Sequence, residues 1–280
     1  MPTSSSLLTI AGTDPCGGAG IQVDLQVFRD FGFHGLSAIT AVLSQNTRGV
    51  QRVDPMPADA VAQQLKSVFE DLRPAGIKIG LLPSKEVVEA VATALKELRE
   101  TRPCPVVFDP VLASSSKHQL VGPGCVEAMR AHLIPQVDLL TPNLNEAEIL
   151  LGQKIHTLAD FQAAASELLG LGCGAALLKA GHLPAQPSEA SGIRDLFADP
   201  QGVASLRELP AIPDDVRGTG CQLSSAILAC VASPPAAITR AGRIDAIERA
   251  RAYLNHLLHT RRRNIGGGRP VIVRERPART

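Results

Sequence analysis

Short apolar runs alternate along the chain with longer segments whose apolar residues recur every three or four positions. The segment from Glu86 to Leu98 is typical of the second kind, because charged side chains fill the positions between its valines, alanines and leucines. The apolar runs read as buried strands, and strands that alternate with helices are typical of a parallel sheet covered on both faces. The pattern therefore predicts an α/β fold with a central, mostly parallel sheet covered on both faces.

The individual elements can be read from this alternation. The predicted strands are LLTIAG, LSAITAVLS, AGIKIGLL, PVVFDPVL, DLLTPN and AALLKAG. One predicted helix begins at Ala19. The others cover Ala58 to Asp71, Ser84 to Glu100, Val126 to Ile134, Glu146 to Leu151 and Ala159 to Gly170.

The pattern changes after Gly181. PAQPSEASG is predicted to be a flexible connection, and IRDLFA and VASLREL flank a turn as the strands of a hairpin do, which predicts an antiparallel edge to the sheet. No period of 20 to 50 residues repeats, and no Pro/Ser-rich linker separates two comparable halves. We therefore expect one domain over residues 1–280.

Composition narrows the function classes. The 280 residues are 45% hydrophobic and carry a formal net charge of +1, so the chain can bury a core, and no overall field attracts it to nucleic acid or a membrane. Aromatic residues are too few for a base-stacking platform. The apolar stretches are shorter than the ~20 residues that a bilayer span needs, and the start has no signal-peptide pattern. We expect a cytoplasmic protein that binds a small molecule.

A glycine-rich turn follows the first predicted strand, from Gly12 to Gly20. Its spacing fits neither a Walker A loop nor a dinucleotide-binding fingerprint, so it is either a tight turn or a place where backbone approaches another ligand. Asp24 lies on the apolar side of the helix that follows. A carboxylate in that position needs a partner, and it either caps internal amides or faces a polar ligand.

A second glycine turn, Gly218-Thr219-Gly220-Cys221, opens a helix. Free amides and the positive end of the helix dipole converge at such a start and favour a phosphate or a transferring phosphoryl group. The same dipole is expected to lower the pKa of the Cys221 thiol. The alternative is a glycine-rich helix start beside an inert, buried cysteine.

Three charged residues follow strands or open a helix. Lys179 ends the run AALLKAG, so the sheet would deliver its ammonium to the carboxyl ends of the strands, where open α/β sheets bind ligands. Asp109 ends VVFDP, although Asp-Pro is also a common strand exit. Glu146 lies in the first turn of a predicted helix, which by itself indicates only a good fit to the helix dipole. The six cysteines show no C-x-x-C spacing, which makes a zinc site improbable.

Seven segments together resemble, in order and spacing, the hydroxymethylpyrimidine/phosphomethylpyrimidine kinases of thiamine biosynthesis, members of the ribokinase-like superfamily. They are TIAGTDPCGGAGIQVDLQVF, GLSAITAVLSQNTRGV, IKIGLL, VFDPVL, TPNLNEAEILLG, LLKAGHL and RGTGCQLSSAI. The resemblance implies a ribokinase-like three-layer αβα sandwich with a central, mostly parallel sheet. It also implies phosphorylation of 4-amino-5-hydroxymethyl-2-methylpyrimidine, first to the monophosphate and then to the diphosphate. It also implies ATP and Mg²⁺ as cofactors and a homodimer, and a monovalent cation is an open question.

The resemblance also implies roles for individual residues. Gln45 would pair with the pyrimidine edge, and Gly12 and Asp24 would line the same pocket. Cys221 would be the base for the hydroxyl in the first step only, since the acceptor of the second step is an ionised phosphate. The amides of Gly218, Thr219, Gly220 and Cys221 would hold the transferring phosphoryl group, Lys179 would neutralise the ATP phosphates, and Glu146 and Asp109 would act on magnesium through waters.

Two departures from the family pattern stand out. The loop at 114–118 differs from the usual sequence, and Arg217 replaces a common histidine, which suggests a phosphate ligand. Two rival functions stay open, a pyridoxal kinase of the same superfamily and a non-catalytic protein that binds a phosphate or a vitamer. Gln45 favours the pyrimidine over pyridoxal, and the joint presence of Lys179, Cys221 and Glu146 argues against a protein that only binds.

Overall fold

The computed structural model describes residues 5–113, 120–180, 195–209, 216–233 and 239–274. Within these residues, nine strands form one sheet in the order β3-β2-β1-β4-β5-β6-β7-β8-β9. The strands are β1 Ser6–Gly12, β2 His34–Asn46, β3 Gly49–Pro55, β4 Ile77–Ile79, β5 Val106–Phe108, β6 Leu139–Leu140, β7 Ala176–Leu178, β8 Leu196–Asp199 and β9 Gly202–Ser205. Six neighbouring strands of this sheet, β2, β1, β4, β5, β6 and β7, are parallel to one another.

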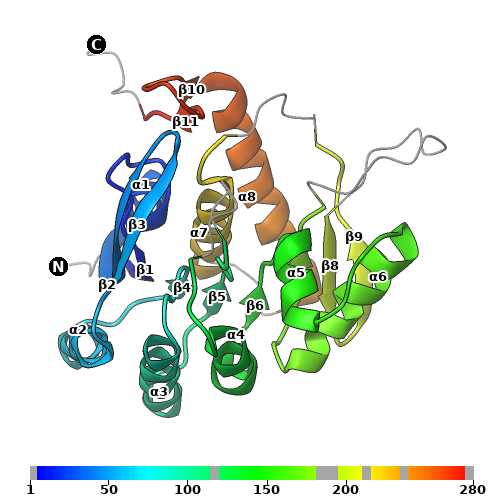
Figure 1. Cartoon of the computed structure of the whole chain (residues 1–280). Helices are drawn as coiled ribbons and strands as arrows, with labels where there is room; N and C mark the ends of the chain where they lie inside the picture. Colours follow the sequence, from blue (N-terminus) through cyan, green and yellow to red (C-terminus); the bar gives the residue numbers. More distant parts are fainter. Residues whose placement is uncertain (1–4, 114–119, 181–194, 210–215, 234–238, 275–280) are drawn as a thin grey trace.

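Both edges of the sheet are antiparallel. The predicted hairpin is confirmed, because β8 pairs with β7 and with β9. The opposite edge strand, β3, pairs with β2 and was not predicted. Part of β2 runs beyond the parallel sheet with β3, and this β2–β3 hairpin extends toward a small second ribbon, β10 Arg262–Arg263 with β11 Val271–Ile272 (Figure 1).

The helices cover the sheet on two faces (Figure 1). They are α1 Gly20–Asp30, α2 Ala58–Asp71, α3 Lys85–Thr101, α4 Cys125–Ala128, α5 Leu144–Leu151, α6 Leu158–Glu167, α7 Thr219–Ala232 and α8 Arg240–Thr260. The first apolar core lies under α2 to α6, and the second lies under α1, α7 and α8. The predicted three-layer αβα sandwich is confirmed.

The helix prediction needs correction at two places. The segment predicted as one helix from Val126 to Ile134 changes form, since α4 is followed by a π-helical turn, Met129–Leu133, and a 3₁₀ turn, Ile134–Gln136. Helix α8 was not predicted, because its buried residues include a charged one, Arg251, which weakens the apolar pattern. The predicted connection PAQPSEASG and the loop at 114–118 lie outside the described residues.

The pleat of the short central strands decides which side chains reach which helices. In β4, Ile77 and Ile79 face the core under α2 and α3, so Lys78 between them faces α1 and α7. In β5, Val107 lies in the second core, and Asp109, two residues on, continues on the same side. The face covered by α7 therefore receives the polar side chains at the carboxyl ends of the strands.

Candidate active site

Three strands deliver polar side chains to one point beneath α7. Asp109 follows β5, Thr141 follows β6 and Lys179 follows β7. The Lys179 Nζ donates to Asp109 Oδ1 at 2.9 Å, and the Thr141 hydroxyl donates to the same oxygen at 3.4 Å. All three lie at the carboxyl edge of the sheet, as predicted for Lys179, and open α/β sheets bind their ligands at this edge.

Helix α7 begins directly above this ion pair. A Cβ atom placed on Gly220 would lie 3.2 Å from Asp109 Oδ2 and 3.6 Å from Lys179 Nζ. The helix starts at Gly218 without a side-chain cap, whereas Asn143 caps α5 and Thr239 caps α8. No side chain therefore competes for the amides of the first turn, and they can bind an anion there.

The two glycine turns pack against each other. Gly218 has φ +70°, and a Cβ on it would lie 1.9 Å from the carbonyl oxygen of Gly18. Gly20 has φ +58°, and a Cβ there would lie 2.5 Å from the carbonyl oxygen of Gly12. Only glycine permits this close approach together with a left-handed backbone. The turn that enters α1 and the turn that enters α7 thus form one continuous wall.

Cys221 lies in the first turn of α7, but its thiol does not have the predicted pKa. Burial raises the pKa to about 11, and the nearby carboxylates of Asp24 and Asp109 act in the same direction. The Lys78 ammonium and a hydrogen bond from the Gly20 amide lower the pKa, but by less. The expectation of a lowered pKa is therefore wrong, because desolvation and two carboxylates outweigh the helix dipole. Cys221 is a thiol at neutral pH.

Asp24 lies in the interior rather than against an open pocket. Its carboxylate is fully buried and accepts from Lys78 Nζ at 2.9 Å, from the Thr9 hydroxyl at 2.6 Å and from the Ser225 hydroxyl at 2.7 Å. These partners are one ammonium and two hydroxyls, not the amides or the ligand considered from sequence. Gly12, the other predicted pocket residue, ends β1 between Leu43 and Leu81.

Lys78 was missed by the sequence analysis. Its side chain is fully buried, and although burial opposes its charge, Asp24 first and then Cys221 and Asp109 raise its pKa. The only sequence signal was a lysine inside the apolar run IKIGLL, where a buried charge demands a partner. Asp24 and Lys78 are both buried charges of this kind, and each is the ion-pair partner of the other.

Glu146 reaches the same region from α5. It completes a capping box with Asn143, whose backbone amide donates to Glu146 Oε2 at 2.8 Å. Burial raises its pKa to about 7, and the negative charge of Asp109 adds to that effect while Lys179 opposes it. For Lys179, burial opposes the charge, but Asp109 and Glu146 together raise the pKa.

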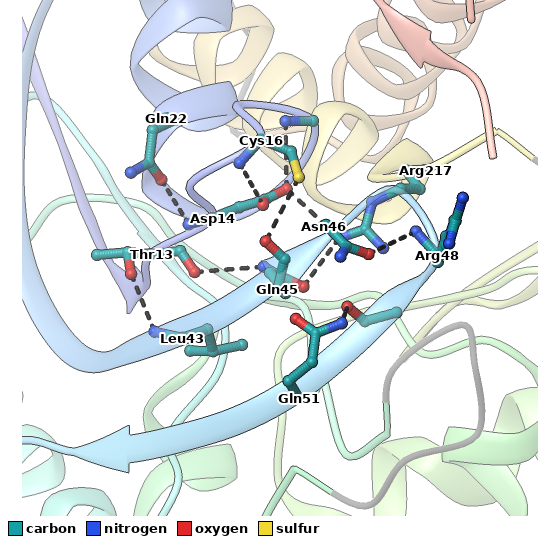
Figure 2. A network of polar contacts seen from close by, with 12 residues as sticks. Thr13, Asp14, Cys16, Gln22, Leu43, Gln45, Asn46, Arg48, Gln51 and Arg217 are labelled. Carbon is teal, nitrogen blue, oxygen red and sulfur yellow. Dashed lines mark hydrogen bonds and ion pairs between the residues drawn. The ribbon is translucent and has the colours of Figure 1, made fainter. Parts of the chain in front are cut away.

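Gln45 lies on the β2–β3 hairpin within a separate polar network (Figure 2). Its side-chain amide donates to the Thr13 carbonyl at 3.4 Å and accepts from Arg217 Nη2 at 2.8 Å. Arg217 Nη2 also approaches Asp14 Oδ2 at 3.5 Å. Arg217 precedes Gly218, so this network joins the hairpin to both glycine turns. Its guanidinium points to Gln45 and Asp14, not toward Lys179.

Within the described part of the chain, no group of three or more His, Cys, Asp or Glu side chains could hold a metal ion. Asp109 and Glu146 are a pair of carboxylates at one edge of the sheet, which suits an ion that keeps most of its waters. No helix among these residues is long and apolar enough to cross a bilayer.

Comparisons with known proteins agree with this geometry. Residues 14–271 match the family model described as phosphomethylpyrimidine kinase. Over 223 residues, the chain is 43% identical to the hydroxymethylpyrimidine/phosphomethylpyrimidine kinase of Escherichia coli, covering 79% of this chain and 81% of that protein.

Two solved structures are also similar. The phosphomethylpyrimidine kinase of Clostridium difficile is 34% identical, with a TM-score of 0.74 over 90% of this chain and 99% of that one. The pyridoxal kinase of Staphylococcus aureus, in complex with AMP-PCP and pyridoxal, is 25% identical, with a TM-score of 0.78 over 96% of this chain and 93% of that one.

The buried ion pair gives a first prediction. Lys78→Met leaves the Asp24 carboxylate buried without an ammonium, which should cost about 3–5 kcal/mol of unfolding free energy. The double variant Lys78→Met/Asp24→Asn should recover part of this loss, since it removes the uncompensated charge. Urea unfolding of the three proteins measures both values. A single variant as stable as the parent would show that the pair contributes no net stability.

The contact between the glycine turns gives a second prediction. Gly218→Ala places a methyl group against the Gly18 carbonyl and should lower kcat by about 10²-fold or more, because the first turn of α7 must move. Gly152→Ala is the matched control, since its φ is +73° and nothing lies within 4 Å of the added Cβ. The control should lose about 1 kcal/mol of stability and keep its activity. Equal kcat in the two variants would contradict the role of the contact.

Proposed function

Since the chain belongs to the phosphomethylpyrimidine kinase family and is a kinase of thiamine biosynthesis, we propose that both of its phosphorylations take place at the start of α7. The first acceptor is the hydroxymethyl group of 4-amino-5-hydroxymethyl-2-methylpyrimidine, and the second is the resulting monophosphate. The uncapped amides of α7 above the Asp109–Lys179 pair carry this assignment. Phosphoryl transfer asks mainly for alignment and charge stabilisation, and this point supplies both.

The transferring phosphoryl group binds the amides of Gly218, Thr219, Gly220 and Cys221. The positive end of the α7 dipole opposes the negative charge on its oxygens. Lys179 neutralises the ATP phosphates, and its pairing with Asp109 holds the ammonium at the edge of the sheet. The AMP-PCP complex of the similar pyridoxal kinase supports ATP as the phosphoryl donor.

Asp109 and Glu146 fit Mg²⁺, because carboxylate oxygens are the ligands it prefers and because it keeps several waters beside substrate phosphates. When bound, the ion neutralises phosphate charge. Both carboxylates would act on the ion through waters; one oxygen of Asp109 accepts from Lys179, and one oxygen of Glu146 accepts from the backbone amide of Asn143. Whether a monovalent cation assists stays an open question.

Cys221 accepts the proton of the hydroxymethyl group in the first step. Because its pKa is raised to about 11, only a small fraction is thiolate at neutral pH, but that thiolate is a strong base. The second step needs no base, because the attacking oxygen belongs to an ionised phosphate.

The pyrimidine ring lies between Gln45 and Gly12, with the edge of the ring against the Gln45 amide. An amide offers a donor and an acceptor side by side, which matches an amino group next to a ring nitrogen. Asp24 does not contact the ring, because its oxygens accept from Lys78 and Ser225. It stabilises the wall of the pocket through its ion pair with Lys78.

Three further features are part of the proposal. The chain forms a single ribokinase-like kinase domain over residues 1–280, it works in the cytoplasm, and it assembles as a homodimer. Its partner is a small-molecule pyrimidine, with no nucleic acid or membrane involved.

A mass-spectrometric time course tests this function. The chain is incubated with ATP, magnesium and the hydroxymethylpyrimidine, and in parallel with pyridoxal. Monophosphate should appear first and diphosphate second. Pyridoxal phosphate as the only product would replace the pyrimidine assignment with a pyridoxal kinase, and no product from either substrate would favour a protein that binds without turnover.

The base role gives a prediction that separates the two steps. Cys221→Ala should slow the first phosphorylation by about 10²-fold or more and leave the second within about threefold, since only the first loses a proton-transfer partner. In the parent chain, the first step should also accelerate by up to about tenfold per pH unit from pH 7 to 9, because the pKa of the thiol lies above this range.

Single-turnover assays that start from the pyrimidine and from its monophosphate measure the two rates. Cys230→Ala is the matched control, as it makes the same change within α7 at a cysteine buried in the core. Equal losses in both steps, or identical pH profiles, would mean that Cys221 acts through the geometry of the helix start.

A further inference from the structure

Arg217 makes one short side-chain contact that the proposed reaction leaves unexplained. Its guanidinium is 7% exposed, and Nη2 lies 2.8 Å from Gln45 Oε1. A second contact, to the Asp14 carboxylate, is longer at 3.5 Å, and the buried Nε has no hydrogen-bond partner among the described residues. The shortest contact of this buried cation is thus with a neutral amide, although a buried carboxylate lies beside it.

The contact fixes which way the Gln45 amide faces. A guanidinium has only donors, so the group that faces Arg217 must be the amide oxygen. On the other side, the Thr13 carbonyl can only accept, so the group that faces it must be the amide nitrogen. Both neighbours therefore demand the same orientation, and rotating the amide by 180° would break both bonds (Figure 2).

The fixed amide still has capacity for a ligand. The oxygen has a second lone pair, and the nitrogen has a second hydrogen. They present one acceptor and one donor in a set order, which is complementary to an amino group beside an unprotonated ring nitrogen. A ring that carries two acceptors, or two donors, at these positions leaves one buried polar group unpaired, and such mismatches are costly.

Arg217 is itself held from both sides. Asp14, which is fully buried, accepts from the amides of Cys16 and Gly18 and so belongs to the first glycine turn. The backbone amide of Arg217 donates to the Pro270 carbonyl at 3.0 Å. The backbone amide of Arg269, which precedes Pro270, donates to the Thr47 carbonyl at 2.9 Å. The C-terminal segment thus joins Arg217 to the hairpin that carries Gln45.

We propose that Arg217 is a positioning residue that locks the Gln45 amide in one orientation and thereby selects rings with an amino group next to a ring nitrogen. This inference rests on the proposed function, in which Gln45 contacts the pyrimidine edge. It assigns Arg217 to recognition of the ring, in place of the phosphate contact suggested by its position in the sequence.

Steady-state kinetics of four variants test the inference: Arg217→Met, Gln45→Ala, the double variant Arg217→Met/Gln45→Ala, and the control Arg48→Met. Arg217→Met should raise KM for the hydroxymethylpyrimidine about tenfold, the effect of losing one charge-assisted hydrogen bond, with KM for ATP unchanged. In the Gln45→Ala background, the same change should add less than about twofold, because Arg217 acts through Gln45. Arg48→Met removes an exposed charge from the same hairpin and should leave both KM values unchanged.

A substrate analogue without the 4-amino group gives a second readout. The parent chain should prefer the amino substrate, and Arg217→Met should reduce that preference about tenfold, since its Gln45 amide can rotate. Arg217→Lys, which keeps a cation that only donates, should retain most of the preference. Arg217→Lys also keeps the test open if Arg217→Met fails to fold.

The outcomes separate the two levels of the argument. A parent chain that does not phosphorylate the pyrimidine overturns the proposed function before any variant is compared. An active parent whose Arg217→Met variant shows additive losses with Gln45→Ala, a raised KM for ATP or an unchanged preference for the amino group overturns the positioning role alone. A loss of preference in Arg217→Lys equal to that in Arg217→Met does the same.

Discussion

Lys78 and Asp24 form an ion pair at the point where β1, β4, α1 and α7 meet. The Asp24 oxygens accept from one group on each of the three other elements: Lys78 on β4, Thr9 on β1 and Ser225 on α7. Removing Asp24 leaves the buried Lys78 ammonium without its carboxylate, and removing Ser225 leaves the buried Asp24 Oδ1 without a partner, so the arrangement is constrained more tightly than an apolar contact of the same size. The helices that follow the two glycine turns are both fixed to the sheet here, and the distance between the turns depends on it.

The same pair sets the electrostatics of the site. Two ammonium groups, Lys78 and Lys179, share the buried region with the carboxyl groups of Asp24, Asp109 and Glu146. Burial is the largest cause of the raised pKa values of Glu146, about 7, and Cys221, about 11, and the negative charge of the neighbouring carboxylates adds to both. Holding a proton at these positions reduces the negative charge that an incoming polyphosphate meets.

The sequence predicted the layers, the parallel strands and the residues at their carboxyl ends, because each of these depends on local periodicity and strand direction. It did not predict the network inside. Asp24 was identified as a carboxylate in need of a partner, but Lys78 lies 54 positions away, and no spacing rule connects them. The predicted direction of the Cys221 pKa shift was wrong for the same reason. The helix dipole is visible in the sequence, whereas the desolvation and the two carboxylates that outweigh it exist only once distant segments are packed together.

In the proposed reaction, the residues at the start of α7 connect recognition of the ring with phosphoryl transfer. Arg217 contacts Gln45, the proposed ring-binding residue, and four residues later comes Cys221, the proposed base, with the backbone of Gly218 packed against Gly18 between them. Under the proposed function, a shift of the ring would act through this short stretch of backbone on the amides above Lys179. An in-line displacement loses about 10²-fold in rate for a misplacement of about 1 Å, so recognition of the ring and alignment of the phosphoryl group depend on the same few atoms.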